Sequence, residues 1–221
     1  MPGISSTAYD RLMRLPIIVF TAYFFVREIL ALDGLLARPP IGWDWSFACA
    51  VAARVSLLGF LGLLIIFHFL RSQPVNKAAG WEPRVSALLG LTLGSLFMLL
   101  DRPALSLELN LVSALLLLVG NYFCIVALMH LGRSISIMAE ARRLVTAGPY
   151  AVVRHPLYLA EEIAVIGVFV QFLSWQAVAI LVVHFLFQVR RMMNEERVLA
   201  ATFPEYREYA QRTPRLIPGV W

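Results

Sequence analysis

Two short polar segments carry the side chains best suited to chemistry, and the first surrounds His155. The turn Gly148–Tyr150 precedes Arg154 and His155, and Pro156 then begins a long apolar stretch. Proline suits the first turn of a helix, where free N–H groups favour a carboxylate or a phosphate. Arg154 and His155 would add hydrogen-bond donors there. A plain junction between loop and membrane, with Arg154 at the lipid headgroups, fits the same residues equally well.

The second polar segment lies where the last apolar stretch ends. It runs from Arg190 to Glu196 and contains Arg191, Glu195 and Glu196. Two neighbouring carboxylates at such a place could bind ribose hydroxyls, an amino group or a cation. The alternative is an interfacial helix stabilised by side-chain pairs four residues apart, such as Arg191 with Glu195. Taken by itself, this segment favours the alternative.

The elements that must position these segments are membrane helices. Of the 221 residues, 60% are hydrophobic and 15% are charged, whereas soluble domains average about 45–50% apolar and about 25% charged residues. The composition excludes a water-soluble globule, a disordered chain and a disulfide scaffold. Cys49 and Cys124 lie inside apolar runs, so we expect neither a disulfide framework nor a cysteine metal site. His68, His130 and His184 show no ligand spacing, and no metal is expected.

Apolar runs predict six spans in an all-α transmembrane helix bundle. A span needs roughly 20 apolar residues, with about 17–25 acceptable. The run 157–189 has 33 residues and would form about 50 Å of helix at about 1.5 Å per residue, too long for one crossing. We therefore divide it at Ser174–Gln176 into a helical hairpin. The other four predicted spans are Leu15–Leu32, Trp45–Leu70, Val85–Leu100 and Leu107–Leu131.

The distribution of Lys and Arg predicts the orientation. The net charge of +5 would suggest a nucleic-acid partner for a soluble protein, but in a membrane protein basic residues gather on the cytoplasmic side, and we expect no nucleic acid. With six spans, Arg38 and Arg102 fall on one side, Arg27 and Arg54 lie within spans, and the other 15 of the 19 Lys and Arg residues share the second side. Both termini are therefore predicted to be cytoplasmic. We expect Arg27, Glu28 and Arg54 to form ion pairs between helices.

A recurring order of short motifs covers roughly residues 131–218. It consists of a Gly-Pro-Tyr turn, Arg-His-Pro-x-Tyr, an apolar hairpin, Glu-Glu-x-x-Leu, an aromatic residue, Glu-Tyr-x-x-Tyr and a closing Ile-Pro. The residues that match are Gly148, Pro149, Tyr150, Arg154, His155, Pro156, Tyr158, Glu195, Glu196, Leu199, Phe203, Glu205, Tyr206, Tyr209, Ile217 and Pro218. This order resembles the isoprenylcysteine carboxyl methyltransferase family, and more broadly the membrane methyltransferases that include phospholipid N-methyltransferases.

The resemblance divides the chain into two parts. Residues 1–131 would form four N-terminal membrane helices. Residues 132–221 would form the methyltransferase core, made of a cytoplasmic loop, the transmembrane hairpin and an amphipathic tail. Because proline interrupts a helix, we expect a break in that tail at Pro204.

The resemblance also implies S-adenosylmethionine as the methyl donor, bound at the cytoplasmic face. Arg191 would orient the acceptor, and Arg154 is the second candidate for this role. These two are the predicted catalytic residues. Glu161 and Glu162, one turn after Tyr158, could hold the acceptor headgroup or pair with loop arginines. The residues implied to bind the cofactor are Gly148, Pro149, Tyr150, His155, Leu157, Tyr158, Glu195 and Glu196.

The expected acceptor is a lipophilic carboxylate, such as that of an isoprenylcysteine, on a small molecule or prenylated substrate that reaches the site from the bilayer. A carboxylate is ionised at neutral pH and needs no general base, so catalysis would rest on alignment in a dry site. A thiol or an amine is the alternative, and an amine would make Glu161, Glu162 or Glu196 relevant to proton removal. A sterol-reductase-like enzyme that binds NADPH through Arg142 and Arg143, and a protein without turnover, are further alternatives.

Overall fold

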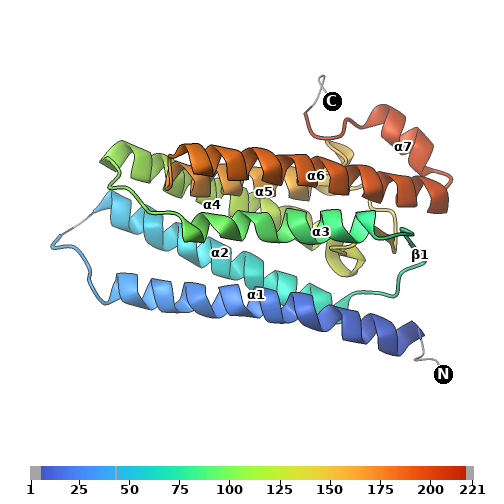
Figure 1. Cartoon of the computed structure of the whole chain (residues 1–221), viewed down its shortest axis with the longest axis horizontal. Coiled ribbons are helices and arrows are strands. Elements are labelled where there is room, and N and C mark those ends of the chain that lie inside the picture. Colours follow the sequence, from blue (N-terminus) through green and yellow to red (C-terminus); the bar gives the residue numbers. More distant parts are fainter. Residues whose placement is uncertain (1–5, 43, 218–221) are drawn as a thin grey trace.

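The chain forms a helix bundle in a computed structural model that describes residues 6–42 and 44–217, with side chains described from residue 14 onward (Figure 1). Consecutive long segments alternate in direction, so the start of α1, the end of α6 and all of α7 lie at one end of the bundle, which we call the α7 end. The helices are α1 (Ser6–Leu36), α2 (Trp45–Leu70), α3 (Glu82–Thr92), α4 (Leu107–Leu131), α5 (Pro156–Val170), α6 (Trp175–Thr202) and α7 (Tyr206–Arg212), with 3₁₀ segments η1 (Leu93–Leu99), η2 (Gly132–Ser134) and η3 (Gly148–Ala151).

Helix starts follow from local side chains. At the start of α2, the Asp44 carboxylate accepts a hydrogen bond of 2.7 Å from the backbone N–H of Ser46. The Ser174 hydroxyl caps α6 in the same way, and Pro156 is the first residue of α5. Ser174 lies within the predicted division of the run 157–189. The predicted hairpin is therefore confirmed, with α5 and α6 as its arms.

Among the residues that the structure describes, four helices are long and apolar enough to cross a membrane, which identifies an integral membrane protein. They lie within Arg14–Leu36, Trp45–Leu70, Leu107–Ser134 and Trp175–Thr202. The 15 residues of α5 extend about 22 Å, less than the ~30 Å of a bilayer core, and α3 has 11 residues before it changes to 3₁₀ geometry. The all-α class is confirmed, whereas the six-span topology and its orientation stay predictions.

The helices α4 and α5 approach each other unusually closely. A Cβ atom on Gly120 of α4 would lie 2.6 Å from the backbone nitrogen of Ala164 on α5, so only glycine fits at that crossing. Further along the same contact, the buried Ser113 hydroxyl donates a 2.8 Å hydrogen bond to the carbonyl oxygen of Gly167. These contacts fix the position of α5 and with it the start of that helix.

The helix α1 packs chiefly against α2. Glu28 of α1 and Arg54 of α2 form an ion pair of 2.7 Å, which confirms the ion pairing expected between these helices. Arg27 does not follow that expectation, because its Nη1 atom donates to the Met98 sulfur at 3.1 Å instead.

Two short strands and a short helix complete the α7 end. Strand β1 (Asn76–Lys77) pairs antiparallel with β2 (Glu140–Ala141). Pro204 lies between α6 and α7, so the predicted interruption of the tail is confirmed. Pro218, the last residue of the motif pattern, lies outside the described residues.

Candidate active site

Glu196, near the end of α6, is the centre of a buried cluster of charges. Its Oε1 atom lies 2.9 Å from Nε2 of His155 and 3.0 Å from Nη1 of Arg154. Arg215 donates to both carboxylate oxygens, from Nε at 2.9 Å and from Nη2 at 2.7 Å. We call these four residues the Glu196 cluster. The hairpin thus brings the two predicted polar segments into direct contact.

The C-terminal segment takes part in this cluster through its backbone as well. The backbone N–H groups of Arg154 and His155 donate to the carbonyl oxygens of Pro214 and Arg215, at 2.8 and 3.1 Å. The hydrogen bond with Glu196 raises the pKa of Arg215 above its ordinary value. Charged and backbone contacts therefore hold the tail against the start of α5.

A second group of contacts joins Tyr158 on α5 to α6. The Tyr158 hydroxyl donates to Oε2 of Glu195 at 3.0 Å, and the His155 ring lies edge-on to the Tyr158 ring, with centroids 5.3 Å apart. The guanidinium carbon of Arg191 lies 5.0 Å from the centre of the Tyr158 ring, and its Nη1 donates to Oε1 of Gln188 at 2.5 Å. The pairing of Arg191 with Glu195, the alternative expected from their spacing, is replaced by this bond to Gln188.

Gly90 on α3 makes room for Arg191. A Cβ atom on Gly90 would collide with Cδ of Arg191 and would lie 3.0 Å from Oε1 of Gln188. The absence of a side chain at position 90 therefore sets the path of the Arg191 side chain.

Polar contacts between α3 and α6 hold this region together. Glu82, at the start of α3, accepts from Nε of Arg190 at 2.6 Å and from Nδ2 of Asn194 at 3.2 Å. The same Asn194 nitrogen donates to the Ser86 hydroxyl at 3.1 Å. The hydrogen bond from Arg190 holds the pKa of Glu82 below its ordinary value. Asn194 and Glu82 thereby fix the α6 turn that carries Glu195 and Glu196.

Arg191 stands between two cavities. A large, mostly apolar cavity of about 850 Å³ lies among α1 to α6, and Glu161, Gln188 and Arg191 line it near the α7 end. Arg191 also lines a narrow slot, too small to hold a water molecule, together with Tyr158, Asn194 and Glu195. Asn194 in turn lines a third cavity of about 420 Å³ beside β1. Arg191 thus borders both the large cavity and the closed slot.

Several residues predicted to bind the cofactor lie away from these three cavities. Gly148 adopts a positive φ of 63° in η3, and a Cβ atom there would collide with the His130 ring. Tyr150 is buried, and its carbonyl oxygen accepts from the Tyr209 hydroxyl at 2.6 Å. Leu157 packs against the core at the α2, α4 and α5 contact. These residues, like Pro149 in η3, line none of the three cavities, and their role in cofactor binding stays a prediction.

The two acids predicted to hold the acceptor point in different directions. Glu161 lines the large cavity, and its Oε2 atom accepts from Nε2 of Gln188 at 3.2 Å. Glu162 is buried towards α6 instead, with its Oε1 atom 3.1 Å from Nε2 of His184. Only Glu161 of this pair therefore borders the space that could receive an acceptor.

Arg142, considered for a nucleotide 2′-phosphate, is buried. Its Nη2 atom donates to Oε2 of Glu140 at 2.6 Å. This arrangement explains Arg142 as a structural residue of the β2 region and gives no support to the NADPH alternative.

The sequence patterns do not point to Gly90, Gln188 or Glu82, and they give Asn194, within the second polar segment, no role of its own. A glycine within an apolar stretch often marks a close approach between membrane helices, and an amide within such a stretch, like Gln188, is costly unless it has a partner. These signals identify positions that need a partner but do not name the partner. Their role in placing Arg191 therefore became visible only in the structure.

Comparison with known proteins finds one matching family and several relatives. Residues 112–201 match the isoprenylcysteine carboxyl methyltransferase (ICMT) family. The cobalt-zinc-cadmium resistance protein CzcN of Cupriavidus metallidurans is 36% identical over 115 residues, 52% of this chain and 50% of the relative. Protein-S-isoprenylcysteine O-methyltransferase B of Arabidopsis thaliana is 34% identical over 112 residues, 48% of this chain and 57% of the relative.

The chain thus spans about half the length of the curated relatives that it matches. The segment that matches the family contains the start of α5 and nearly all of α6. It therefore includes His155, Tyr158, Arg191 and Glu196. Through residues 112–201, this integral membrane protein is similar to the ICMT family, and through about half of its length to an isoprenylcysteine O-methyltransferase.

Proposed function

We propose that the chain is an S-adenosylmethionine-dependent methyltransferase that acts on the carboxylate of a lipophilic acceptor. The observation that carries this proposal is the position of Arg191, which lines both the polar slot and the large apolar cavity. A methyl donor on one side and an apolar acceptor on the other would meet at this side chain. The family of residues 112–201 supports the same chemistry.

The residues around the slot fit the polar groups of S-adenosylmethionine. Glu195 offers a carboxylate for an amino group or ribose hydroxyls, and Asn194 offers an amide. The Nε atom of Arg191 is buried and has no hydrogen-bond partner among the residues that the structure describes, so it can donate to a bound molecule. Arg154 and Arg215 of the Glu196 cluster provide positive charge for a carboxylate. The slot is narrow, so binding would require it to widen into the cavity beside β1.

The protein's own contribution is to orient the acceptor and to exclude water. When bound, S-adenosylmethionine supplies a methyl carbon whose bond to sulfur breaks as a bond to the acceptor oxygen forms. Arg191 would hold the acceptor carboxylate by charge-assisted hydrogen bonds, and the Tyr158 ring would keep the guanidinium in place. The apolar walls of the large cavity would exclude water from the reacting groups, so alignment would provide most of the rate increase.

We also propose that the α7 end faces the cytoplasm. The cofactor is a soluble cytosolic molecule, whereas a lipophilic acceptor would come from the bilayer into the large cavity. The distribution of Lys and Arg in the sequence favours this orientation.

Glu161 supports an amine acceptor as a second candidate. Its carboxylate lines the large cavity near Arg191 and could bind an ammonium group. The chemical stability of the product separates the two acceptors, because a methyl ester is hydrolysed by alkali and releases methanol, whereas an N-methyl group is stable under the same conditions.

The test uses the full chain purified in a non-ionic detergent. Calorimetric titration with S-adenosylhomocysteine should show binding, and titration with NADPH should show none. With methyl-labelled S-adenosylmethionine and a farnesylated cysteine as acceptor, we expect alkali-labile label in the lipid fraction. Binding of NADPH without binding of S-adenosylhomocysteine would overturn the proposal, and alkali-stable label would replace the carboxylate by the amine.

A further inference from the structure

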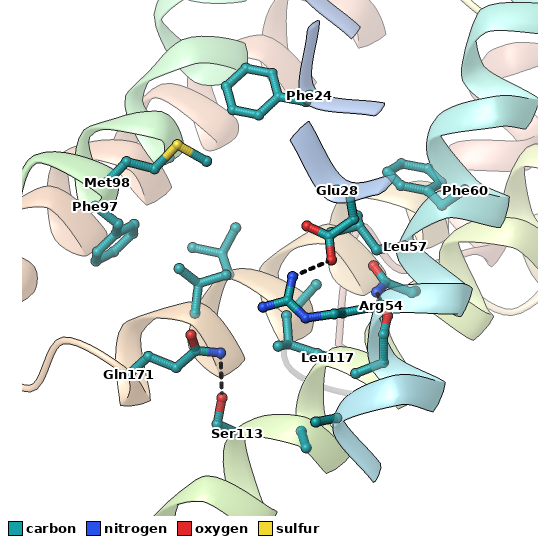
Figure 2. Close-up of a pocket in the computed structure, with 18 of the residues that line it drawn as sticks. Phe24, Glu28, Arg54, Leu57, Phe60, Phe97, Met98, Ser113, Leu117 and Gln171 are labelled. Atoms are coloured by element: carbon teal, nitrogen blue, oxygen red, sulfur yellow. Dashed lines mark hydrogen bonds and ion pairs between the residues drawn. The ribbon is translucent and has the colours of Figure 1, made fainter. Parts of the chain in front are cut away.

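The large cavity has a second polar end, far from Arg191. Figure 2 shows the ion pair of Glu28 and Arg54 at this end, together with Gln171, whose amide donates to the Ser113 hydroxyl at 2.8 Å. We call this region the far end of the cavity.

The two polar ends are separated by a stretch whose lining is mostly apolar, with Asn121 among the few polar residues. Glu161 and Gln171 both line the cavity and are ten residues apart on and just after α5, which corresponds to about 15 Å along a helix axis. Apolar side chains that line the same cavity between these levels include Leu57, Phe60 and Leu117 (Figure 2). The cavity is therefore shaped for an elongated molecule that is apolar in the middle and polar at both ends.

The far end carries more positive than negative charge. Glu28 pairs with Arg54, but Arg102, which also lines the cavity, makes its hydrogen bond to the uncharged Gln171 side chain and lies over the Phe172 ring. No carboxylate forms an ion pair with Arg102 among the residues that the structure describes. Burial and the charge of Arg54 lower the pKa of Arg102, as expected for two guanidinium groups that are close enough to repel each other. Arg38 and Asp44 also line this end. Because their charges are opposite, the excess of positive charge at the far end is unchanged.

We propose that the cavity binds an elongated amphiphile whose second, anionic group is held at the far end by Arg54 and Arg102. The placement of the group to be methylated at Arg191 rests on the proposed function. The anion site at the far end is argued only from the cavity and the charges that line it. The acceptor class is thereby narrowed to molecules with two polar groups separated by about 15 Å.

Substitutions at Glu28 and at Arg54 should change anion affinity in opposite directions. An incoming anion competes with the Glu28 carboxylate for Arg54. Removing the carboxylate in Glu28→Gln releases Arg54 and should strengthen anion binding, whereas Arg54→Gln should weaken it. If the ion pair served only to hold α1 against α2, both substitutions would disturb the cavity in the same direction.

The experiment titrates the full chain in a non-ionic detergent with dodecanedioate, with ω-hydroxydodecanoate as the matched ligand that lacks the second charge. For the unsubstituted protein, dodecanedioate should bind at least tenfold more tightly, since a charge-assisted hydrogen bond is involved. Arg54→Gln and Arg102→Gln should each remove most of this preference, and Glu28→Gln should increase it. Arg212→Gln is the control, because this arginine lies on α7 with its side chain 73% exposed.

Equal affinity for the two ligands would overturn the proposal, as would weaker dodecanedioate binding in a folded Glu28→Gln variant. A failure of Arg54→Gln to fold leaves Glu28→Gln and Arg102→Gln as the tests. The titration contains no cofactor and measures no methyl transfer. Preference for dodecanedioate without binding of S-adenosylhomocysteine would therefore contradict only the proposed function, and the reverse result would contradict only the far-end site.

Discussion

Nε2 of His155 lies 2.9 Å from Oε1 of Glu196 although the two residues are 41 positions apart. His155 immediately precedes α5 and Glu196 lies near the end of α6, so their contact closes the hairpin at its base. Arg215, in the segment after α7, binds the same carboxylate. Three separate parts of the chain are thus joined at one side chain.

Replacing Glu196 by glutamine should loosen the whole cluster. The substitution leaves Arg154, His155 and Arg215 without their shared carboxylate, and breaking a buried ion pair costs roughly 3–5 kcal/mol. We expect a lower thermal midpoint and S-adenosylhomocysteine affinity reduced about tenfold to hundredfold. Glu208→Gln is the matched control, since that carboxylate is 70% exposed in its pair. Unchanged affinity in a folded Glu196→Gln protein would remove the cluster from the cofactor site.

Arg191→Ala should reduce turnover more than cofactor binding. If this side chain orients the acceptor, the rate of methyl transfer should fall about 10²–10³-fold, as for loss of one positioned donor. The dissociation constant for S-adenosylhomocysteine should change little in the same protein. Arg191→Lys should restore only part of the rate, because lysine cannot make the two parallel hydrogen bonds of a guanidinium group. A large loss of affinity in Arg191→Ala would reassign the residue to the cofactor.

Gly90→Ala should displace the Arg191 side chain while leaving its guanidinium group unaltered. The added methyl group would meet Cδ of Arg191, and such overpacking costs roughly 1–3 kcal/mol unless the side chain moves. We expect the methyl-transfer rate to fall at least tenfold. Gly34→Ala on α1 is the control, because no atom lies within 4 Å of its added Cβ. Equal rates in the two variants would show that the Arg191 position is not limiting.

The tail should detach in alkali. Burial raises the pKa of Tyr209 to about 12, above the value of about 10 for an exposed tyrosine. A raised pKa means that the folded protein binds this proton more tightly than the unfolded chain. Its contribution to stability is therefore complete below pH 10 and is lost as the pH rises towards 12. Thermal unfolding between pH 9 and 12 should show this decline, and Tyr209→Phe should show a smaller one. An identical decline in both proteins would assign it to other groups.

The orientation is tested at Gln211, on α7. In a variant without Cys49 and Cys124, a single cysteine at position 211 should react with an impermeant thiol reagent only after the inner face of the membrane is opened. Reaction in intact cells would place α7 outside and contradict both the cytoplasmic tail and the proposed side for the cofactor.

Local signals in the sequence predicted most helix positions. Pro156 and the apolar run after it placed α5, and the length of the run 157–189 required a hairpin even though no glycine or proline marked its turn. The structure supplies the missing signal in Ser174, which caps α6. The irregular geometry of η1 was not predictable, because a change from α to 3₁₀ depends on tertiary packing rather than on apolar periodicity.

The candidate site was predicted in its residues but only partly in its arrangement. The hairpin implied that His155 and Glu196 would meet, and they do. No sequence pattern predicts that Arg215 shares Glu196 or that Gly90 faces Arg191, because both contacts join segments far apart in the chain. Such contacts are fixed by packing of whole helices, which one sequence does not reveal.

The close contact of α4 with α5 limits where a molecule from the bilayer can enter the helix bundle. A helix pair that touches backbone to backbone at Gly120 and Gly167 leaves no space for a lipid chain to slip between its members. The helix α1, by contrast, rests chiefly on α2 and borders the large cavity through Phe24. A hydrophobic molecule entering laterally from the bilayer would therefore pass beside α1, opposite the closely packed pair α4 and α5.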